Sequence, residues 1–158
     1  MANRNEGHAQ PKSPSASDPV EARKVAAETA RIVTVRPLAE TMTRQHLPYF
    51  VGISRNTAGA TGVSMHMLVI PPGAAAEPHL HRGYETAIYL LEGGVETRYG
   101  PGLAQSVFNQ AGDFNFIPAN VPHQPINLST TQPARAIVAR NDPNEQESVE
   151  LYEARPGG

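Results

Sequence analysis

The sequence predicts an all-β fold, a barrel or jelly roll built from many short strands. Glycine and proline supply 13 and 15 of the 158 residues, which favours frequent turns over a helical bundle. Short apolar stretches with strand-like alternation lie between these turns, and strands do not alternate with helices as in a βα fold. The length fits one domain plus a tail. We expect residues 1–30 to form a disordered tail that could include one short helix, and residues 31–158 to form the barrel.

The N-terminal elements are predicted from local composition. Residues 1–17 are rich in Asn, Ser, Pro and Gly and lack the apolar side chains that would offset the entropy of ordering. Residues 18–21 (DPVE) are typical of a helix start, with an acidic N-cap and proline at the first helical position. The alanine-rich run to Ala30 could continue this helix. Residues 32–35 and 49–53 are expected to be strands, because β-branched and aromatic residues are enriched there.

The remaining strands follow from alternation and turn residues. Residues 63–70 (VSMHMLVI) are largely apolar on both faces, which predicts a strand that is buried on both sides. Glu92-Gly93-Gly94-Val95 predicts a tight hairpin, and in 95–99 charged residues alternate with Val95, Thr97 and Tyr99, so one face of that strand meets solvent. Further strands are expected at 84–91, near Val107 and at 135–140.

Two stretches in the middle of the chain carry the polar residues of a site. His79 and His81 are separated by one residue, so on a strand both imidazoles point to the same face. Glu85 follows four residues later, and Gly83 permits a bend that could bring it to the same centre. His123 would arrive from a distant strand. Three imidazoles and one carboxylate suit one divalent transition metal ion: Fe, Mn, Ni, Cu, Co or Zn.

The residues around these donors resemble the two motifs of the cupin superfamily. In the first motif the matching residues are Gly73, His79, His81, Glu85 and Gly93, with the family's shorter gap between histidine and glutamate. In the second motif they are Gly112, Pro118, His123 and Asn127. Asn120 stands where the family usually has glycine, but asparagine tolerates positive φ, so we expect the turn to survive. The resemblance covers residues 73–127.

This resemblance implies a small single-domain protein, a cupin-type double-stranded β-helix (jelly-roll) barrel. It also implies one metal ion bound by His79, His81, Glu85 and His123, and a homodimer as the assembled form.

Other residues near the site are weaker candidates. His66 could be a proton shuttle if it faces the cavity, or a packed core histidine. Tyr89 shares the strand face of Glu85, so its hydroxyl could reach a ligand, or it could be a core tyrosine. The same alternation would turn Ala87 and Leu91 inward, whereas Ile88 and Leu90 would face outward, where a second layer or subunit could cover them. For Arg55, Arg98 and Arg140, we weigh a carboxylate clamp against a solvated surface arginine.

Composition narrows the partners. A formal charge of −2 provides no basic patch for nucleic acid, and no apolar run approaches the length of a membrane span. The absence of cysteine removes a disulfide frame and a thiolate nucleophile. The N-terminus lacks the apolar core of a signal peptide. We therefore expect a cytoplasmic protein with a small-molecule substrate and neither nucleic acid nor membrane as a partner.

The sequence is compatible with three functions. The first is an oxygenase of the dioxygenase type that acts on a small chelating organic metabolite, because two neighbouring oxygens could chelate such a metal. The second is a non-redox isomerase, epimerase or lyase at the same centre, with the metal as Lewis acid. The third is a small-molecule-binding or sensing protein without turnover.

Overall fold

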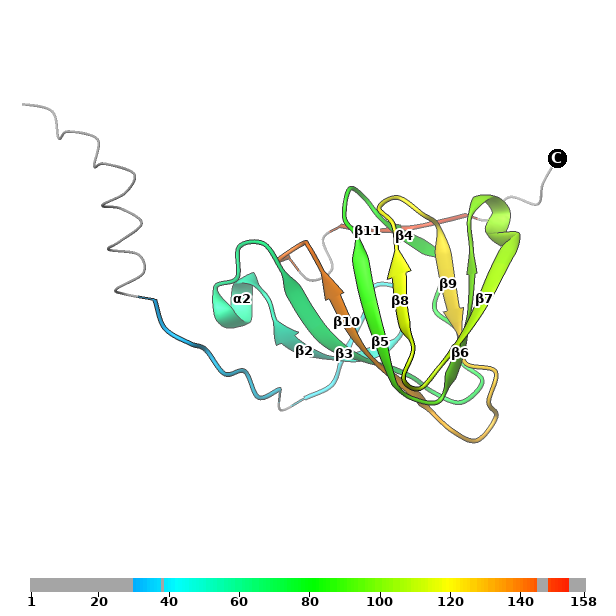
Figure 1. The fold of residues 1–158 in the computed structure, drawn as a ribbon, viewed down its shortest axis with the longest axis horizontal. Coiled ribbons are helices and arrows are strands. Elements are labelled where there is room, and N and C mark those ends of the chain that lie inside the picture. The colour runs from blue at the N-terminus through cyan, green and yellow to red at the C-terminus, as the bar shows by residue number, and fades with distance from the viewer. Residues whose placement is uncertain (1–29, 38, 145–147, 154–158) are drawn as a thin grey trace, which may run out of the picture. The chain divides into compact units, whose positions relative to one another are not determined.

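The structure is a computed structural model that describes residues 30–37, 39–144 and 148–153 (Figure 1). The chain divides into two units, Met1–Val33 and Thr34–Gly158. All of the described strands lie in the second unit. The tail and the short helix predicted for residues 1–30 lie outside the described residues, except for Ala30.

The strands form two antiparallel sheets, which confirms the all-β jelly-roll prediction. The six-stranded sheet has the order β1-β2-β3-β10-β5-β8, with β1 at Thr41–Met42, β2 at Pro48–Ile53, β3 at Ser64–Ile70, β10 at Ala134–Arg140, β5 at Thr86–Glu92 and β8 at Phe114–Ile117. The five-stranded sheet has the order β11-β4-β9-β6-β7, with β11 at Val149–Leu151, β4 at His79–His81, β9 at His123–Ile126, β6 at Gly94–Tyr99 and β7 at Gln105–Gln110.

Two short helical segments lie between the described strands. Helix α2 at Arg55–Ala58 begins at Ser54, whose hydroxyl accepts a hydrogen bond from the N–H of Thr57, and it ends at Gly59 in the left-handed conformation. The 3₁₀ segment η1 spans Pro101–Leu103. In the described part of the chain, no helix has the length and apolar character needed to cross a bilayer.

The segment at Gly93 passes the chain from one sheet to the other. It joins β5, which pairs with β10 and β8, to β6, which pairs with β7 and β9. The predicted hairpin is therefore wrong, because the two adjoining strands do not pair. Gly93 has φ 77°, and a Cβ there would lie 2.8 Å from the carbonyl oxygen of Pro133. A positive φ and this close approach both require glycine.

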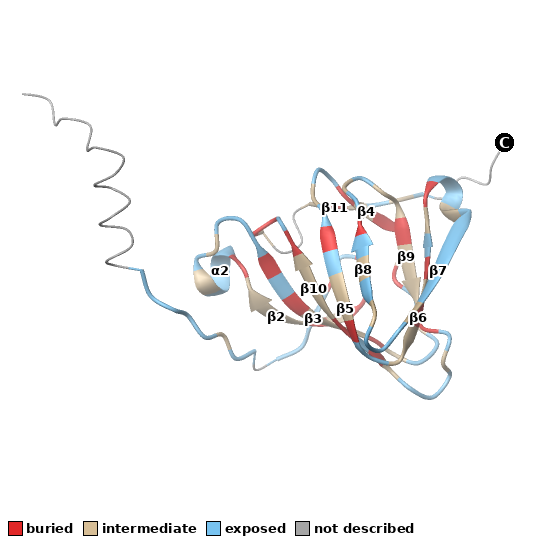
Figure 2. Cartoon of the chain, in the orientation of Figure 1, coloured by how far each residue is buried: buried red, intermediate tan, exposed pale blue. Residues whose placement is uncertain are grey.

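Alternation along the central strands β3, β10 and β5 separates an inner face from an outer face (Figure 2). Along β10, Ala134, Ala136 and Arg140 are buried, and along β3 the buried residues are Ser64, His66 and Ile70. The opposite face of β3 is not covered within the chain, since Met65 is 44% exposed. The expectation that this strand is buried on both sides is therefore wrong for the single chain.

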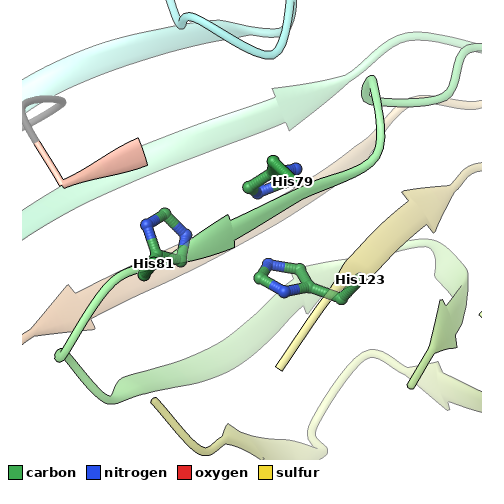
Figure 3. Close-up of side chains that lie close together, drawn as sticks. All are labelled: His79, His81 and His123. Atoms are coloured by element: carbon green, nitrogen blue, oxygen red, sulfur yellow. The ribbon is translucent and has the colours of Figure 1, made fainter. Parts of the chain in front are cut away.

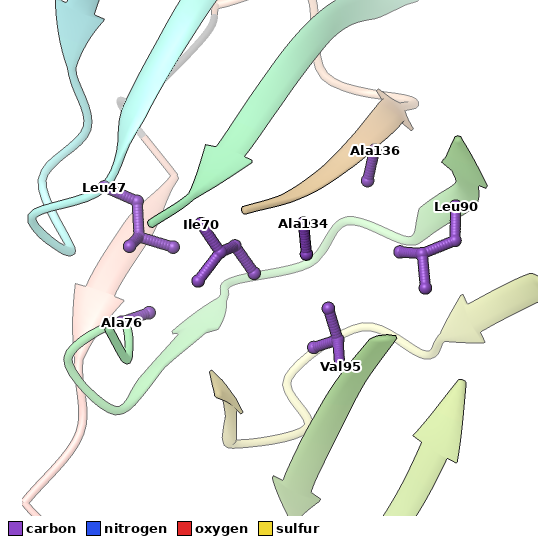
Figure 4. Packing of buried hydrophobic residues seen from close by; sticks show 7 residues of the cluster. All are labelled: Leu47, Ile70, Ala76, Leu90, Val95, Ala134 and Ala136. Atoms are coloured by element: carbon purple, nitrogen blue, oxygen red, sulfur yellow. The ribbon is translucent and has the colours of Figure 1, made fainter. Parts of the chain in front are cut away.

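The apolar core takes residues from both sheets and from two loops (Figure 4). Its members are Leu47, Ile70, Ala76, Leu90, Val95, Ala134 and Ala136. The core is small because the other inward-facing positions line a cavity between the sheets. The predicted strand at 32–35 is absent, since residues 31–37 carry no strand pairing and Ile32 is exposed.

Candidate metal centre

Three imidazoles converge inside the barrel (Figure 3). His79 and His81 begin and end β4 and point to the same face, as the spacing predicted. His123 begins β9 and is the direct cross-strand partner of His79. One ring nitrogen of each residue lies within 4.8 Å of the corresponding nitrogen of the other two. All three side chains are buried.

Backbone carbonyls fix the orientation of two of the rings. The Nδ1–H of His79 donates to the carbonyl of Glu77 over 2.8 Å, and the Nδ1–H of His123 donates to the carbonyl of Val121 over 2.9 Å. A carbonyl can only accept, so the proton of each neutral ring is on Nδ1 and the lone pair is on Nε2. A hydrogen bond of this kind orients metal-binding histidines.

Burial keeps the three rings neutral. Desolvation, followed by repulsion from His123, lowers the pKa of His79 to about 3. Desolvation also lowers the pKa of His123 to about 4. The pKa of His81 is lowered further still, by burial and then by the charge of Arg140. Neutral imidazole is the form that binds a metal ion, and it is the prevailing form in this cavity at neutral pH.

Arg140 lies beside this group. It ends β10, is 6% exposed, and its Nη2 donates to Nε2 of His81 over 3.0 Å. Its Nε donates to the hydroxyl of Thr86 over 3.1 Å. Burial lowers the pKa of Arg140 to about 10, so the guanidinium remains charged at neutral pH. The site therefore combines three neutral imidazoles with one buried cation.

Glu85, the fourth predicted ligand, does not join the histidines. Its side chain is exposed, and its backbone N–H donates to the side chain of Asn141. The inward position belongs to the next residue, Thr86, which is 2% exposed. The predicted inward face of β5 was therefore off by one residue. Ala87 and Leu91 are exposed, whereas Leu90 is buried in the core.

The two candidate catalytic residues lie away from the cavity wall. His66 is buried, but it packs edge-on against Tyr49, and its Nδ1 accepts the N–H of Gly52 over 3.3 Å. Tyr89 faces the outside of its sheet, where its ring contacts Phe114. The reason is again strand alternation, because Thr86, Ile88 and Leu90 occupy the inner face of β5.

The cavity that contains the histidines is mainly apolar. Its apolar walls come from both sheets and include Leu68, Ile70, Ile88, Leu90, Val95, Ile117 and Val138. Besides the histidines and Arg140, its polar lining comes from Gln45, Thr86, Thr97, Asn109, Asp113 and Asn115. The side-chain oxygens of Gln45 and Asn109 are buried without a hydrogen-bond partner. A ligand of this cavity would therefore meet apolar walls and a few convergent polar groups, as in many small-molecule sites.

The second motif also behaves as its sequence predicted. Asn120 has φ 65°, and its side-chain oxygen accepts the N–H of Gly83 over 2.9 Å. It thus supports the turn after β4. Asn127 is 1% exposed, and its amide group donates to the carbonyls of Ile70 and Gln132. Asn127 fixes the loop after β9 rather than facing a ligand.

Sequence reasoning missed the position of Arg140 and the role of Thr86. Strand alternation could have located Arg140, because Ala134 and Ala136 share its parity and are small enough for a core face. No comparable pattern pointed to Thr86, since Glu85 beside it is the more common metal ligand.

Comparison with known proteins identifies the family. A model described as a cupin domain matches residues 66–140, a range that contains all three histidines. Among solved structures, the chain is similar to the polyketide cyclase RemF from Streptomyces resistomycificus, at 21% identity and a TM-score of 0.62, covering 78% of this chain and 87% of that chain.

It is also similar to an oxalate decarboxylase from Lactobacillus farciminis in a formate complex, at 20% identity and a TM-score of 0.61. That match covers 72% of this chain and 33% of the decarboxylase. A third similar structure is an uncharacterized double-stranded β-helix protein from Klebsiella pneumoniae, at 18% identity and a TM-score of 0.56, covering 78% and 98% of the two chains. A search of curated proteins found no match. The domain match and the shared fold place this chain in the cupin superfamily.

Proposed function

We propose that this chain is a metal-dependent enzyme that acts on a small chelating organic molecule inside the barrel. The observation that carries the proposal is the convergence of three neutral imidazoles on one point of a buried cavity. Three protein ligands are typical of catalytic metal sites, because they leave coordination positions open for water or substrate.

The residues present fit a divalent transition ion. His79 and His123 already direct an Nε2 lone pair away from the carbonyls that hold their Nδ1–H groups. The third ligand would be His81, whose ring lies within 5.4 Å of both other rings, centroid to centroid. When bound, such an ion would supply Lewis-acid polarisation, and a redox-active ion would also supply electrons to dioxygen. The donor set does not select one of these metals.

The chain's own residues would bind and orient the substrate. The apolar walls exclude water, which strengthens the electrostatic interactions of any group held there. Arg140 provides positive charge, while the side-chain oxygens of Gln45 and Asn109 offer further polar contacts in the same cavity. We therefore expect a compact substrate with one polar end and an apolar body.

Two reaction classes are compatible with this site. An oxygenase reaction is the first, because a dry apolar cavity protects reactive species from water. A non-redox lyase, isomerase or cyclase reaction is the second, and Asp113 favours it, because a carboxylate that lines the cavity could move a proton. Two of the similar structures, a polyketide cyclase and an oxalate decarboxylase, agree with the second class.

The test is a turnover assay with defined metals. Metal-free protein prepared with a chelator is reloaded with Fe²⁺ or Zn²⁺ and incubated with a panel of small hydroxy and keto acids, with and without oxygen. We expect turnover to require the metal. Loss of activity without oxygen indicates an oxygenase, and equal activity with Zn²⁺ indicates non-redox chemistry. Turnover that survives complete metal removal would contradict the proposal.

We further propose that the protein forms a homodimer through the outer face of the six-stranded sheet. A row of cross-strand neighbours on this face is apolar and consists of Phe50, Met67, Ile137, Tyr89 and Phe114. The adjacent row consists of Ile53, Met65, Ala139, Ala87 and Phe116. Phe114 is 82% exposed and Phe116 is 59% exposed. A contiguous apolar face of this kind indicates a protein interface.

Light scattering after size exclusion tests the dimer. We expect twice the chain mass for the wild type and for Leu128→Ser, a control at an exposed loop leucine. Phe114→Lys combined with Phe116→Lys should yield monomers. A monomeric wild type at micromolar concentration would refute the dimer and leave the metal site untouched.

A further inference from the structure

Arg140 occupies a position that a surface arginine would not. It lies on the inner face of β10, lines the same cavity as the three histidines, and donates hydrogen bonds to Thr86 and His81. Placing a guanidinium in an apolar interior is costly unless the charge is used. The buried carboxylate of Asp142 attracts this charge electrostatically.

The contact between Arg140 and His81 uses the lone pair that a metal ion would need. Guanidinium only donates, so Nε2 of His81 must be the acceptor. The proton of the neutral ring is then on Nδ1, which is buried without a hydrogen-bond partner. Nε2 has one lone pair. A metal ion at Nε2 and the hydrogen bond from Arg140 therefore exclude each other.

Metal binding would consequently release one N–H of a buried cation next to a second cation. Both charges would lie in an apolar cavity, where like charges repel strongly. An anionic ligand resolves both problems, because it can approach the metal and accept the released N–H at once. A carboxylate suits this role, since one of its oxygens can approach the metal while the other accepts the N–H of Nη2.

Resting on the metal site of the proposed function, we propose that Arg140 recognises the carboxylate or similar oxyanion of the substrate, and that anion and metal bind cooperatively. Thr86 acts as a positioning residue, because its hydroxyl accepts from Nε and fixes the guanidinium plane. Ile88 and Val138 lie on the inner faces of the same strands and would contact the apolar part of such a ligand. The substrate class is thus a small organic anion.

The experiment measures Co²⁺ affinity with and without formate, which serves as the probe anion. Metal-free wild-type protein is titrated calorimetrically, alongside Arg140→Met, Arg140→Lys and the control Arg135→Gln. Arg135 is exposed on the same strand and faces Glu92 on the outside. Circular dichroism and thermal melting verify that each variant is folded.

For wild type and Arg135→Gln, we expect formate to lower the dissociation constant of Co²⁺ by about fivefold or more, the usual range for coupled sites. Arg140→Met should bind Co²⁺ more tightly than wild type without formate, because the competing hydrogen bond and charge are gone, and formate should no longer help. Arg140→Lys keeps the charge without the fork, so its formate effect should fall between the two. If Arg140→Met does not fold, Arg140→Lys and Thr86→Val test the inference instead. In both variants, formate should lower the dissociation constant of Co²⁺ less than it does in the wild type.

The inference is overturned if formate does not change Co²⁺ affinity in the wild type, or if Arg140→Met and Arg140→Lys keep the full effect. Both results leave the metal site itself intact. A wild type that binds no Co²⁺ at all would instead remove the proposed metal site, and with it the basis of this inference.

Discussion

At the scale of single residues, three imidazoles can share one cavity because burial keeps each of them neutral. Each ring loses its hydration, and the resulting drop in pKa keeps it neutral and able to donate a lone pair. Two of the rings are fixed by carbonyls two residues before them in sequence. Local backbone contacts therefore help to orient these two rings.

Thr86→Val tests the support of the buried guanidinium. The substitution keeps the shape of the side chain but removes the acceptor of the Arg140 Nε–H. A buried donor without a partner costs about 1–3 kcal/mol, so the free energy of unfolding in urea should fall by that amount. Thr131→Val, at an exposed position, is the control and should change little. Equal stabilities of the two variants would show that the bond is not important.

The sequence predicts the positions of some site residues but not of others. The spacing of His79 and His81 was sufficient to place both on one face, and the second motif correctly added His123. The inward orientation predicted for Glu85 differs from the structure because alternation assigns faces only once the first residue of the strand is known. The turn at Gly83 sets that residue as Thr86, and a shift of one position reverses every side chain of β5. The chemistry of a single position cannot reveal this shift.

Glu85→Ala tests this register directly. Because the Glu85 side chain is exposed and Thr86 occupies the inner position, the substitution should leave the affinity for Co²⁺ unchanged. His81→Ala, in contrast, removes one of the three converging nitrogens and should weaken binding strongly. Calorimetric titration of both variants provides the comparison. A loss in Glu85→Ala similar to that in His81→Ala would mean that β5 has the opposite register when metal is bound.

At the scale of elements, Gly93 determines how the two sheets connect. Sequence patterns suggested a hairpin there because paired glycines between strands are typical of one. However, strand pairing depends on strands that are distant in sequence. The partners of β5 lie in the six-stranded sheet, whereas those of β6 lie in the five-stranded sheet. The pattern was informative about the turn but not about the topology.

Gly93→Ala should destabilise the barrel more than Gly83→Ala. The two glycines have nearly equal φ values of 77° and 76°, so the left-handed strain of about 1–2 kcal/mol is common to both. Only at Gly93 would the new Cβ meet backbone, at 2.8 Å from the oxygen of Pro133, whereas nothing lies within 4 Å at Gly83. Denaturant unfolding should show the extra loss, about 1–3 kcal/mol for overpacking. Equal losses would contradict the close approach.

At the scale of the whole molecule, folding removes the histidines from water and thereby lowers their pKa values. The unfolded chain exposes them at an ordinary pKa near 6.5, whereas the folded cavity holds the pKa of His79 at about 3 and that of His123 at about 4. As pH falls below about 6.5, the unfolded state therefore binds protons that the folded metal-free state does not.

The free energy of unfolding of the metal-free protein should consequently decrease as pH falls from about 6.5 toward 4. Urea unfolding at several pH values measures the slope. His79→Phe, which removes one of the buried imidazoles, should show a shallower slope than the wild type. A stability that rises on acidification across this window would contradict the burial of neutral rings.

The most direct test of the account is the stoichiometry of Co²⁺ binding to the metal-free protein. Wild type and His46→Ala should bind one ion per chain, because the exposed histidine takes no part in the converging group. His123→Ala should lose that binding while it retains the same circular dichroism spectrum. If His123→Ala binds one ion as tightly as the wild type, the three imidazoles do not form the metal site.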